Sequence, residues 1–270
     1  MRKLITLVLL LSISFSYAQS PWTRAKGKTF LQVGATGLFY DSYEFDGKKV
    51  ENAGDFTDIT TQIYGEYGIT NQLEALVIVP FKMVSVENAL VPSSSLTGFG
   101  NVSLGLKYKL SDQRWKVSSG IIYTANTIKK DAASGLSTGF NATTFLPYLA
   151  VGSSHDKWYY YGNVGYGLMT NDYSDYLKLT FEVGYEVIEQ GHLIFVLDTR
   201  NVVSKEDAYY TDAAQWPSYL DRQTFNALGI KANYEFKKEA YGVNLAAFGA
   251  TGIDNAPLAP TFNIGIYTKF

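Results

Sequence analysis

The 270-residue sequence contains no cysteine, which excludes disulfide bonds, thiolate metal sites and cysteine nucleophiles. Histidine is also scarce, with two residues, and proline contributes only seven. Charged residues make up 18% of the chain, below the roughly 25% of an average soluble domain. The formal net charge of -2 provides no basic field, so nucleic acid is not an expected partner.

Long apolar runs are missing from most of the chain, which excludes a bundle of membrane-spanning helices. The one apolar run, residues 4–15, follows Arg2 and Lys3 and precedes the small residue Ala18. This is the pattern of a secretory signal peptide, and the run is too short to span a bilayer. We therefore expect residues 1–18 to be cleaved after Ala18, with an N-terminal anchor helix as the alternative. Residues 19–270 are then one exported domain.

Alternation of apolar and polar residues dominates this domain. In residues 101–110 and 177–187, every second residue is apolar and most of the intervening residues are polar or glycine. A period of two with one apolar face indicates a β-strand that lies between two different environments. The high content of tyrosine (21) and phenylalanine (16) favours the same structure, because aromatic side chains suit pleated surfaces.

About a dozen such strands are expected, each longer than the ~5–6 residues of an average strand in a globular protein. Tilted strands that cross a membrane need about 9–11 residues. The alternative is a water-soluble β-sandwich, which should have shorter strands. The predicted strands are 28–39, 56–67, 73–84, 99–110, 115–127, 140–151, 158–169, 176–187, 193–202, 224–236, 241–250 and 261–270.

The predicted connections alternate between short and long. Short turns at one end and long loops at the other are typical of an outer-membrane β-barrel, with its short turns in the periplasm. Residues 203–223 form the longest predicted loop, which is rich in aromatic residues. Aromatic residues that gather near the short turns would form a girdle at the lipid headgroups: Tyr67, Tyr108, Trp115, Trp158, Tyr234, Phe236, Tyr241 and Phe270.

Three segments resemble a known family. They are residues 67–74 (YGITNQLE), 79–81 (VPF) and 98–108 (GFGNVSLGLKY). In this order they are similar to the outer-membrane barrels of the putative MetA-pathway phenol-degradation family, although Asn101 stands where that family usually has Asp. The resemblance implies a transporter related to channels for hydrophobic substrates. Residues 21–28 (PWTRAKGK) look like the start of barrels from Bacteroidetes.

The polar face of each strand would point into the lumen of such a barrel. Positive and negative side chains occur there in similar numbers, so strong ion selectivity is not expected. Because a buried charge needs a partner, we expect Arg200 or Lys231 to pair with nearby acids. The two hypotheses are a packed network that fills the barrel and a constriction that controls passage. The candidates, on three consecutive predicted strands, are Glu182, Asp198, Arg200 and Lys231.

Two prolines, Pro80 and Pro147, fall inside predicted strands. Proline lacks the N–H that a β-ladder requires, so each marks a bulge, a bend or an edge. One hypothesis is a kinked wall through which an apolar solute leaves sideways into the bilayer. The other is a tolerated bulge near a strand end.

The predicted function is passive uptake of small solutes, hydrophobic or aromatic ones included, by a monomeric outer-membrane channel that needs no cofactor or metal. A barrel of twelve strands leaves only a narrow passage. A non-conducting structural or adhesive barrel is the alternative. An outer-membrane lipid-modifying enzyme is less favoured, because His155 and His192 both fall at short turns. The terminal Phe270 resembles the signal that the barrel-assembly machinery recognises, and membrane lipid is the other expected partner.

Overall fold

The computed structural model describes residues 19–45, 47–87, 94–131, 133–203 and 222–270, and all of its regular elements are β-strands. The strands are β1 (Thr29–Phe45), β2 (Lys48–Gly68), β3 (Leu73–Glu87), β4 (Ser94–Phe99), β5 (Ser103–Asp112), β6 (Lys116–Thr124), β7 (Thr144–His155), β8 (Trp158–Met169), β9 (Tyr176–Ile188), β10 (Gly191–Val202), β11 (Thr224–Lys237), β12 (Tyr241–Asp254), β13 (Ala256–Pro257) and β14 (Thr261–Lys269).

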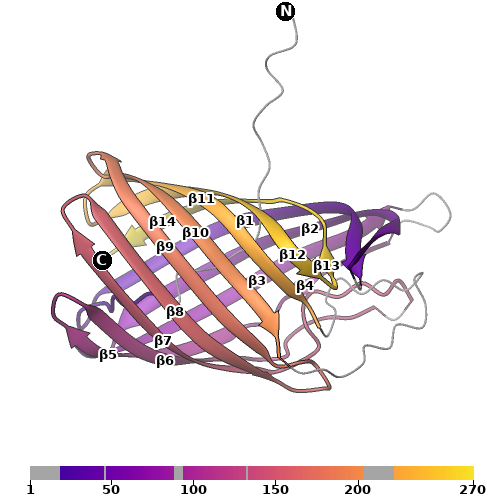
Figure 1. The fold of residues 1–270 in the computed structure, drawn as a ribbon, viewed down its shortest axis with the longest axis horizontal. Helices are drawn as coiled ribbons and strands as arrows, with labels where there is room; N and C mark the ends of the chain where they lie inside the picture. The colour runs from indigo at the N-terminus through magenta and orange to yellow at the C-terminus, as the bar shows by residue number, and fades with distance from the viewer. Residues whose placement is uncertain (1–18, 46, 88–93, 132, 204–221) are drawn as a thin grey trace, which may run out of the picture.

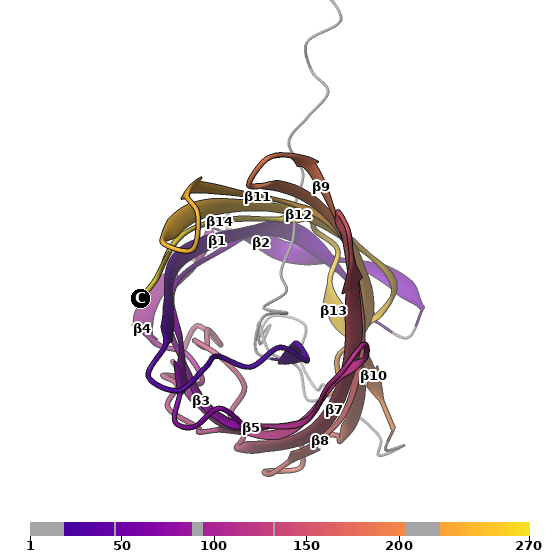
Figure 2. The same ribbon diagram turned by 90° about the vertical axis from the view of Figure 1, so that its left-hand side faces the viewer.

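These strands form one closed antiparallel barrel, as the sequence predicts. Consecutive strands pair with each other, except that β3 pairs with both β4 and β5 and that β12 pairs with β14 past the short β13. The ring closes where β14 pairs with β1, from Phe30↔Lys269 to Leu38↔Thr261. With β4 and β5 counted as two halves of one strand, and the two-residue β13 set aside, the described residues contribute twelve strands. The strands tilt across the long axis of the molecule (Figure 1) and form a round ring when the barrel is viewed end-on (Figure 2). Within the described residues, no helix meets the length and apolarity needed to span a bilayer.

The two faces of the wall differ as the alternation predicts. On β5, for example, Leu104 and Leu106 are about half exposed on the outside, whereas Lys107 is fully buried inside. The eight aromatic residues predicted to lie near the short turns are all exposed on the outside, between 39% for Tyr234 and 62% for Phe270. A barrel whose outer surface is apolar and whose interior is polar has the inverse arrangement to a soluble protein.

Some predicted boundaries are wrong. The expected long loop between Tyr40 and Asp55 is instead a continuation of β1 and β2, which pair up to Phe45↔Lys48. The polar residues of this stretch favoured a loop, but Tyr40, Tyr43 and Phe56 are buried and give the hairpin an apolar face. The loop expected after residue 250 is likewise shortened, because β12 continues to Asp254 and β13 pairs with β1.

The single strand predicted at 99–110 is broken into β4 and β5. β3 pairs with β5 up to Ile78↔Ser103 and with β4 from Phe81↔Phe99 onward. On its other edge β4 has no strand partner among the described residues, because β6 ends at Thr124 and β7 begins at Thr144. The wall is therefore interrupted beside β4, toward the end of the barrel that carries the long connections.

Candidate functional site

The first described residues, 19–28, lie inside the barrel before the chain enters β1. Figure 2 shows this indigo segment within the ring, at the end where the short turns lie. Pro21 is fully buried and Gln19 is 4% exposed. The segment ends where Gly27, with a φ of +77°, turns the chain into β1 and donates its N–H to Gly68. The lumen is thus occupied near the short turns by the protein's own chain.

Charged side chains of the wall bind this segment. Glu66 accepts a hydrogen bond from Arg24 Nε at 2.6 Å, and Glu74 accepts one from the Arg24 backbone N–H at 2.6 Å. Lys107 lies 2.8 Å from Glu74 and donates to the Trp22 carbonyl at 2.7 Å. Buried charges are stable only when paired and hydrogen-bonded, so these contacts join residues 19–28 to β2, β3 and β5.

The Trp22 side chain connects the segment to the opposite part of the wall. Its ring meets the rings of Tyr159 and Tyr161 edge-on, with centroids 5.8 and 5.7 Å apart. Both tyrosine hydroxyls donate to the Glu182 carboxylate, at 2.7 and 3.3 Å. Glu182 in turn lies 2.5 Å from the ammonium of Lys231. A single network thus runs from the segment through β8 and β9 to β11.

The four predicted lumen residues all point inward, but they do not form one cluster. Lys231 contacts Glu182, whereas the Asp198 carboxylate accepts two hydrogen bonds from Lys178, at 2.7 and 2.9 Å. Arg200 contacts no carboxylate among the described residues. It packs against aromatic rings instead. The sequence analysis did not predict Lys178 as the partner of Asp198. In the observed register Lys178 lies directly across from Arg200, two residues beyond Asp198 on β10.

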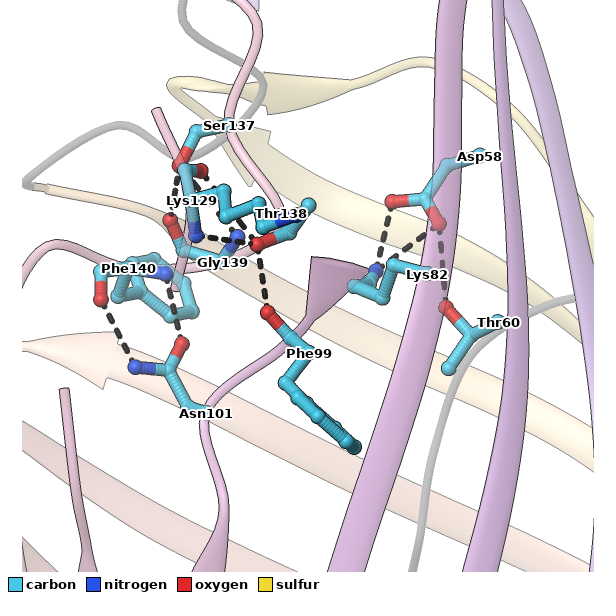
Figure 3. A network of polar contacts seen from close by, with 10 residues as sticks. All are labelled: Asp58, Thr60, Lys82, Phe99, Asn101, Lys129, Ser137, Thr138, Gly139 and Phe140. Atoms are coloured by element: carbon cyan, nitrogen blue, oxygen red, sulfur yellow. Dashed lines mark hydrogen bonds and ion pairs between the residues drawn. The ribbon is translucent and has the colours of Figure 1, made fainter. Parts of the chain in front are cut away.

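A cavity of about 370 Å³ occupies the other half of the lumen, nearer the long connections. Apolar side chains such as Leu38, Ile78 and Phe225 line it together with hydroxyl and amide groups. The lining also contains an ion pair, in which the Lys82 ammonium contacts both oxygens of Asp58 at 2.9 and 2.7 Å (Figure 3). This volume lies within the range typical of small-molecule sites, which are mostly apolar with a few polar groups.

Residues 125–143 cover the interruption in the wall with side-chain hydrogen bonds instead of a ladder. The Asn101 amide donates to the Phe140 carbonyl at 2.8 Å and accepts from the Phe140 N–H at 2.8 Å. The Thr138 hydroxyl donates to the Phe99 carbonyl at 2.6 Å, while the Phe99 ring points away from this contact (Figure 3). Asn101, Thr138 and Phe140 all line the cavity, so the interruption and the cavity share one boundary.

A turn within the same segment is held by Asp131. Its carboxylate accepts hydrogen bonds from the Ser134 hydroxyl and from the backbone N–H groups of Ala133 and Ser134. These bonds stabilise the charged form and lower the pKa of the Asp131 carboxyl. Leu136, which follows, is fully buried. Asp131 and residues 133–140 are therefore held by specific contacts at both ends of this stretch.

The two predicted wall-kink prolines have different surroundings. Pro80 lies at the point where β3 changes its partner from β5 to β4, and its carbonyl accepts a hydrogen bond from Gly100 at 2.9 Å. Pro147 pairs with Ile121 of β6, and the β7–β8 ladder skips Leu146 and Pro147 without a shift of register. Only Pro80 also lines the cavity.

Sequence reasoning did not find residues 19–28 as a lumen segment. The available signal was negative: alternation begins only at residue 28, although nine residues of varied character, 19–27, precede it and contain Trp22 and Arg24. Most of the predicted loop 203–223 lies outside the described residues, since residues 204–221 are not described. The aromatic-rich loop that the sequence predicts there stays a prediction.

Comparison with known protein families shows which family this chain is related to. The family model described as "Putative MetA-pathway of phenol degradation" matches residues 22–245. The chain belongs to this family. The match begins at Trp22 and includes Glu66, Glu182, Arg200 and Lys231. It therefore covers most of the lumen segment and the wall from β1 to β11. No curated protein matches the sequence.

Solved structures show the same fold. An outer-membrane channel of Pseudomonas putida F1 is similar with a TM-score of 0.75 at 16% identity, covering 96% of this chain and 100% of that one. The β domain of the Bordetella autotransporter BrkA has a TM-score of 0.54 at 8% identity, over 91% and 100% of the two chains. The KdgM porin has a TM-score of 0.51 at 8% identity, over 88% and 99%. The phenol-degradation family member therefore has the fold of outer-membrane barrels.

Proposed function

We propose that this protein is an outer-membrane channel for passive uptake of small amphipathic or apolar solutes, aromatic ones included. The observation that carries the proposal is the cavity of about 370 Å³ in a barrel whose outer face is apolar. The cavity combines apolar walls with a few polar groups, which suits a solute that is not fully hydrophilic. Similarity in fold to a solved outer-membrane channel supports the location.

The route of the solute follows from what bounds the cavity. Residues 19–28 narrow the straight passage toward the short turns, which in outer-membrane barrels lie in the periplasm. Beside the cavity, the described residues that close the wall next to β4 are 125–131 and 133–143, and Pro80 and Asn101 border both features. We infer that an apolar solute leaves sideways there, with Pro80 as a wall kink. Pro147, which does not line the cavity, is a tolerated irregularity.

Two uptake measurements test the channel. Cells that express the protein should take up toluene-sized aromatic solutes from water faster than cells with an empty vector, and the rate should rise linearly with concentration. Equal rates in both strains, with folded protein present in the outer membrane, would overturn the proposal. Swelling of proteoliposomes in small sugars gives the second measurement, since a narrow lumen predicts slow entry that falls steeply with solute size.

A non-conducting barrel is the second candidate, because residues 19–28 and the ion pairs of Glu66 and Glu182 fill much of the lumen. It predicts no uptake in either measurement. Enzymatic activity is not part of the proposal. His155, at the short turn before β8, is 84% exposed and contacts only Asp156 among the charged groups described near it. We also propose that the chain is a cleaved, monomeric protein, assembled through its β14 end; a bacteroidete origin is consistent with residues 21–28.

A further inference from the structure

The Arg200 side chain is buried in the barrel without an acidic partner. Its exposed fraction is 8%, and it borders the cavity. Three buried carboxylates of the barrel interior each form an ion pair with a lysine instead, at 2.5–2.7 Å: Asp58, Glu182 and Asp198. Arg200 has no ion pair of this kind among the described residues. A buried cation without a counter-ion is costly, so its position calls for an explanation.

Aromatic rings and a sulfur atom surround this guanidinium. Its central carbon lies 3.8 Å from the Tyr176 ring centroid and 4.8 Å from that of Phe140. One terminal nitrogen donates to the Met169 sulfur at 3.1 Å, which is a weak acceptor. The Nε atom is buried and has no hydrogen-bond partner. Stacking on a ring orients the plane of the group while leaving N–H donors unused.

The charge of the cavity favours an anion. Of the described residues that line it, only Asp58, Lys82 and Arg200 are charged, and the first two neutralise each other. The residue directly across from Arg200 on the neighbouring strand does not neutralise its charge. That residue is Lys178, which is itself a cation and pairs with Asp198. A net charge of one positive unit on the lining of a cavity attracts a single negative charge.

We propose that Arg200 is an anion-binding subsite of the cavity, and that its ligand is a small amphipathic carboxylic acid. The carboxylate would take the free N–H donors of Arg200, and the apolar part would lie against Phe140, Phe225 and Ile78 of the same cavity. Arginine is suited to this role because its planar group binds a carboxylate through two parallel hydrogen bonds. The inference rests on the proposed channel function and names the solute class of that channel.

A matched pair of probes tests the subsite: 3-phenylpropanoate and its uncharged amide, 3-phenylpropanamide. Calorimetric titration of the protein in lipid nanodiscs should show saturable binding of the acid, at least tenfold tighter than that of the amide. The variant R200M should lose at least tenfold in affinity for the acid and keep its affinity for the amide within twofold. The variant R200K, which keeps the charge without the planar fork, should lie between them.

The control is K130M, which removes a positive charge at an exposed residue of the 125–143 segment outside the cavity lining. It should bind the acid as the wild type does. Heat-dependent gel mobility of every variant reports whether the barrel has folded. Wild-type protein that shows no saturable acid binding, or that binds acid and amide equally, overturns the subsite. So does a folded R200M that keeps wild-type affinity for the acid.

Uptake by the same wild-type preparation separates this result from the channel proposal. Uptake of uncharged aromatic solutes without any preference for the acid would overturn the role of Arg200 alone. Loss of uptake and conductance for every solute would overturn the channel function. Acid binding that persists in such a non-conducting barrel would still support the subsite.

Discussion

The ammonium of Lys231 lies 2.5 Å from the carboxylate of Glu182, and both side chains are at most 5% exposed. The same carboxylate accepts hydrogen bonds from the hydroxyl groups of Tyr159 and Tyr161, whose rings contact the Trp22 ring. One buried ion pair of the wall therefore supports the residues that hold the N-terminal segment in the lumen.

Breaking this pair on one side should destabilise the barrel. Either E182Q or K231M leaves one buried charge without its partner, which typically costs about 3–5 kcal/mol. Urea unfolding of the reconstituted protein measures the loss. The double variant E182Q/K231M removes both charges and should recover most of it, so the cycle gives the coupling directly. Additive losses in the double variant would mean that the two groups are not coupled.

The same residues test the predicted constriction. If Arg200 and Lys231 control passage, replacing both with Ala should raise the conductance and change the ion selectivity in single-channel recordings. Unchanged conductance and selectivity would leave the charged network with a packing role only. This comparison distinguishes the two hypotheses that the sequence leaves open.

Gly68 should be intolerant of any side chain. A Cβ at this position would lie 2.1 Å from the Ala25 carbonyl oxygen, a backbone atom of the lumen segment. G68A should therefore destabilise the protein by about 1–3 kcal/mol, or push residues 19–28 out of place and raise the conductance. G249A is the control, because a Cβ added at Gly249 would have no atom within 4 Å. Wild-type stability and conductance in G68A would contradict the observed position of the segment.

The interruption beside β4 can be locked. A Cβ at Gly98 would lie 3.1 Å from Lys129 Cγ, the place that the sulfur of a cysteine at 129 would occupy. The variant G98C/K129C should form a disulfide, and the chain has no other cysteine to interfere. If solutes leave sideways, oxidation should slow uptake of apolar aromatic solutes several-fold, and a reductant should restore it.

Two controls complete this experiment. Each single-cysteine variant should be insensitive to oxidant, and the ion conductance of the locked double variant should stay at the wild-type level. An oxidised double variant, with the cross-link verified by mass spectrometry, that takes up apolar solutes at the wild-type rate would refute lateral exit.

Much of the barrel follows from the sequence because each strand carries its own evidence. In β5, the alternation of Leu104, Leu106 and Lys107 alone determines which side chains point inward, and the observed burial agrees. Length added the second criterion, since strands this long suit a membrane. The family resemblance of residues 67–108 is also correct, because the family model matches a region that includes them.

Features that depend on contacts between distant residues could not be predicted in this way. Arg24, for example, contacts Glu66 and Glu74, which lie 42 and 50 positions further along the chain, and no local sequence pattern predicts these contacts. Nor does periodicity show which acid each cation meets. Asp198 pairs with Lys178 and Arg200 with none among the described residues, because the register of β9 and β10 decides the neighbours.

Single-channel recording of the wild type beside the double variant W22A/R24A tests the central claim most directly, namely that a membrane barrel is narrowed by its own N-terminal segment. The variant removes two side chains of the segment that contact the wall, and K26A, a substitution of an exposed residue in the same segment, is the control. We expect small currents from the wild type and K26A, and severalfold larger currents from W22A/R24A. Equal currents from all three proteins, or no current from any of them, would contradict the account.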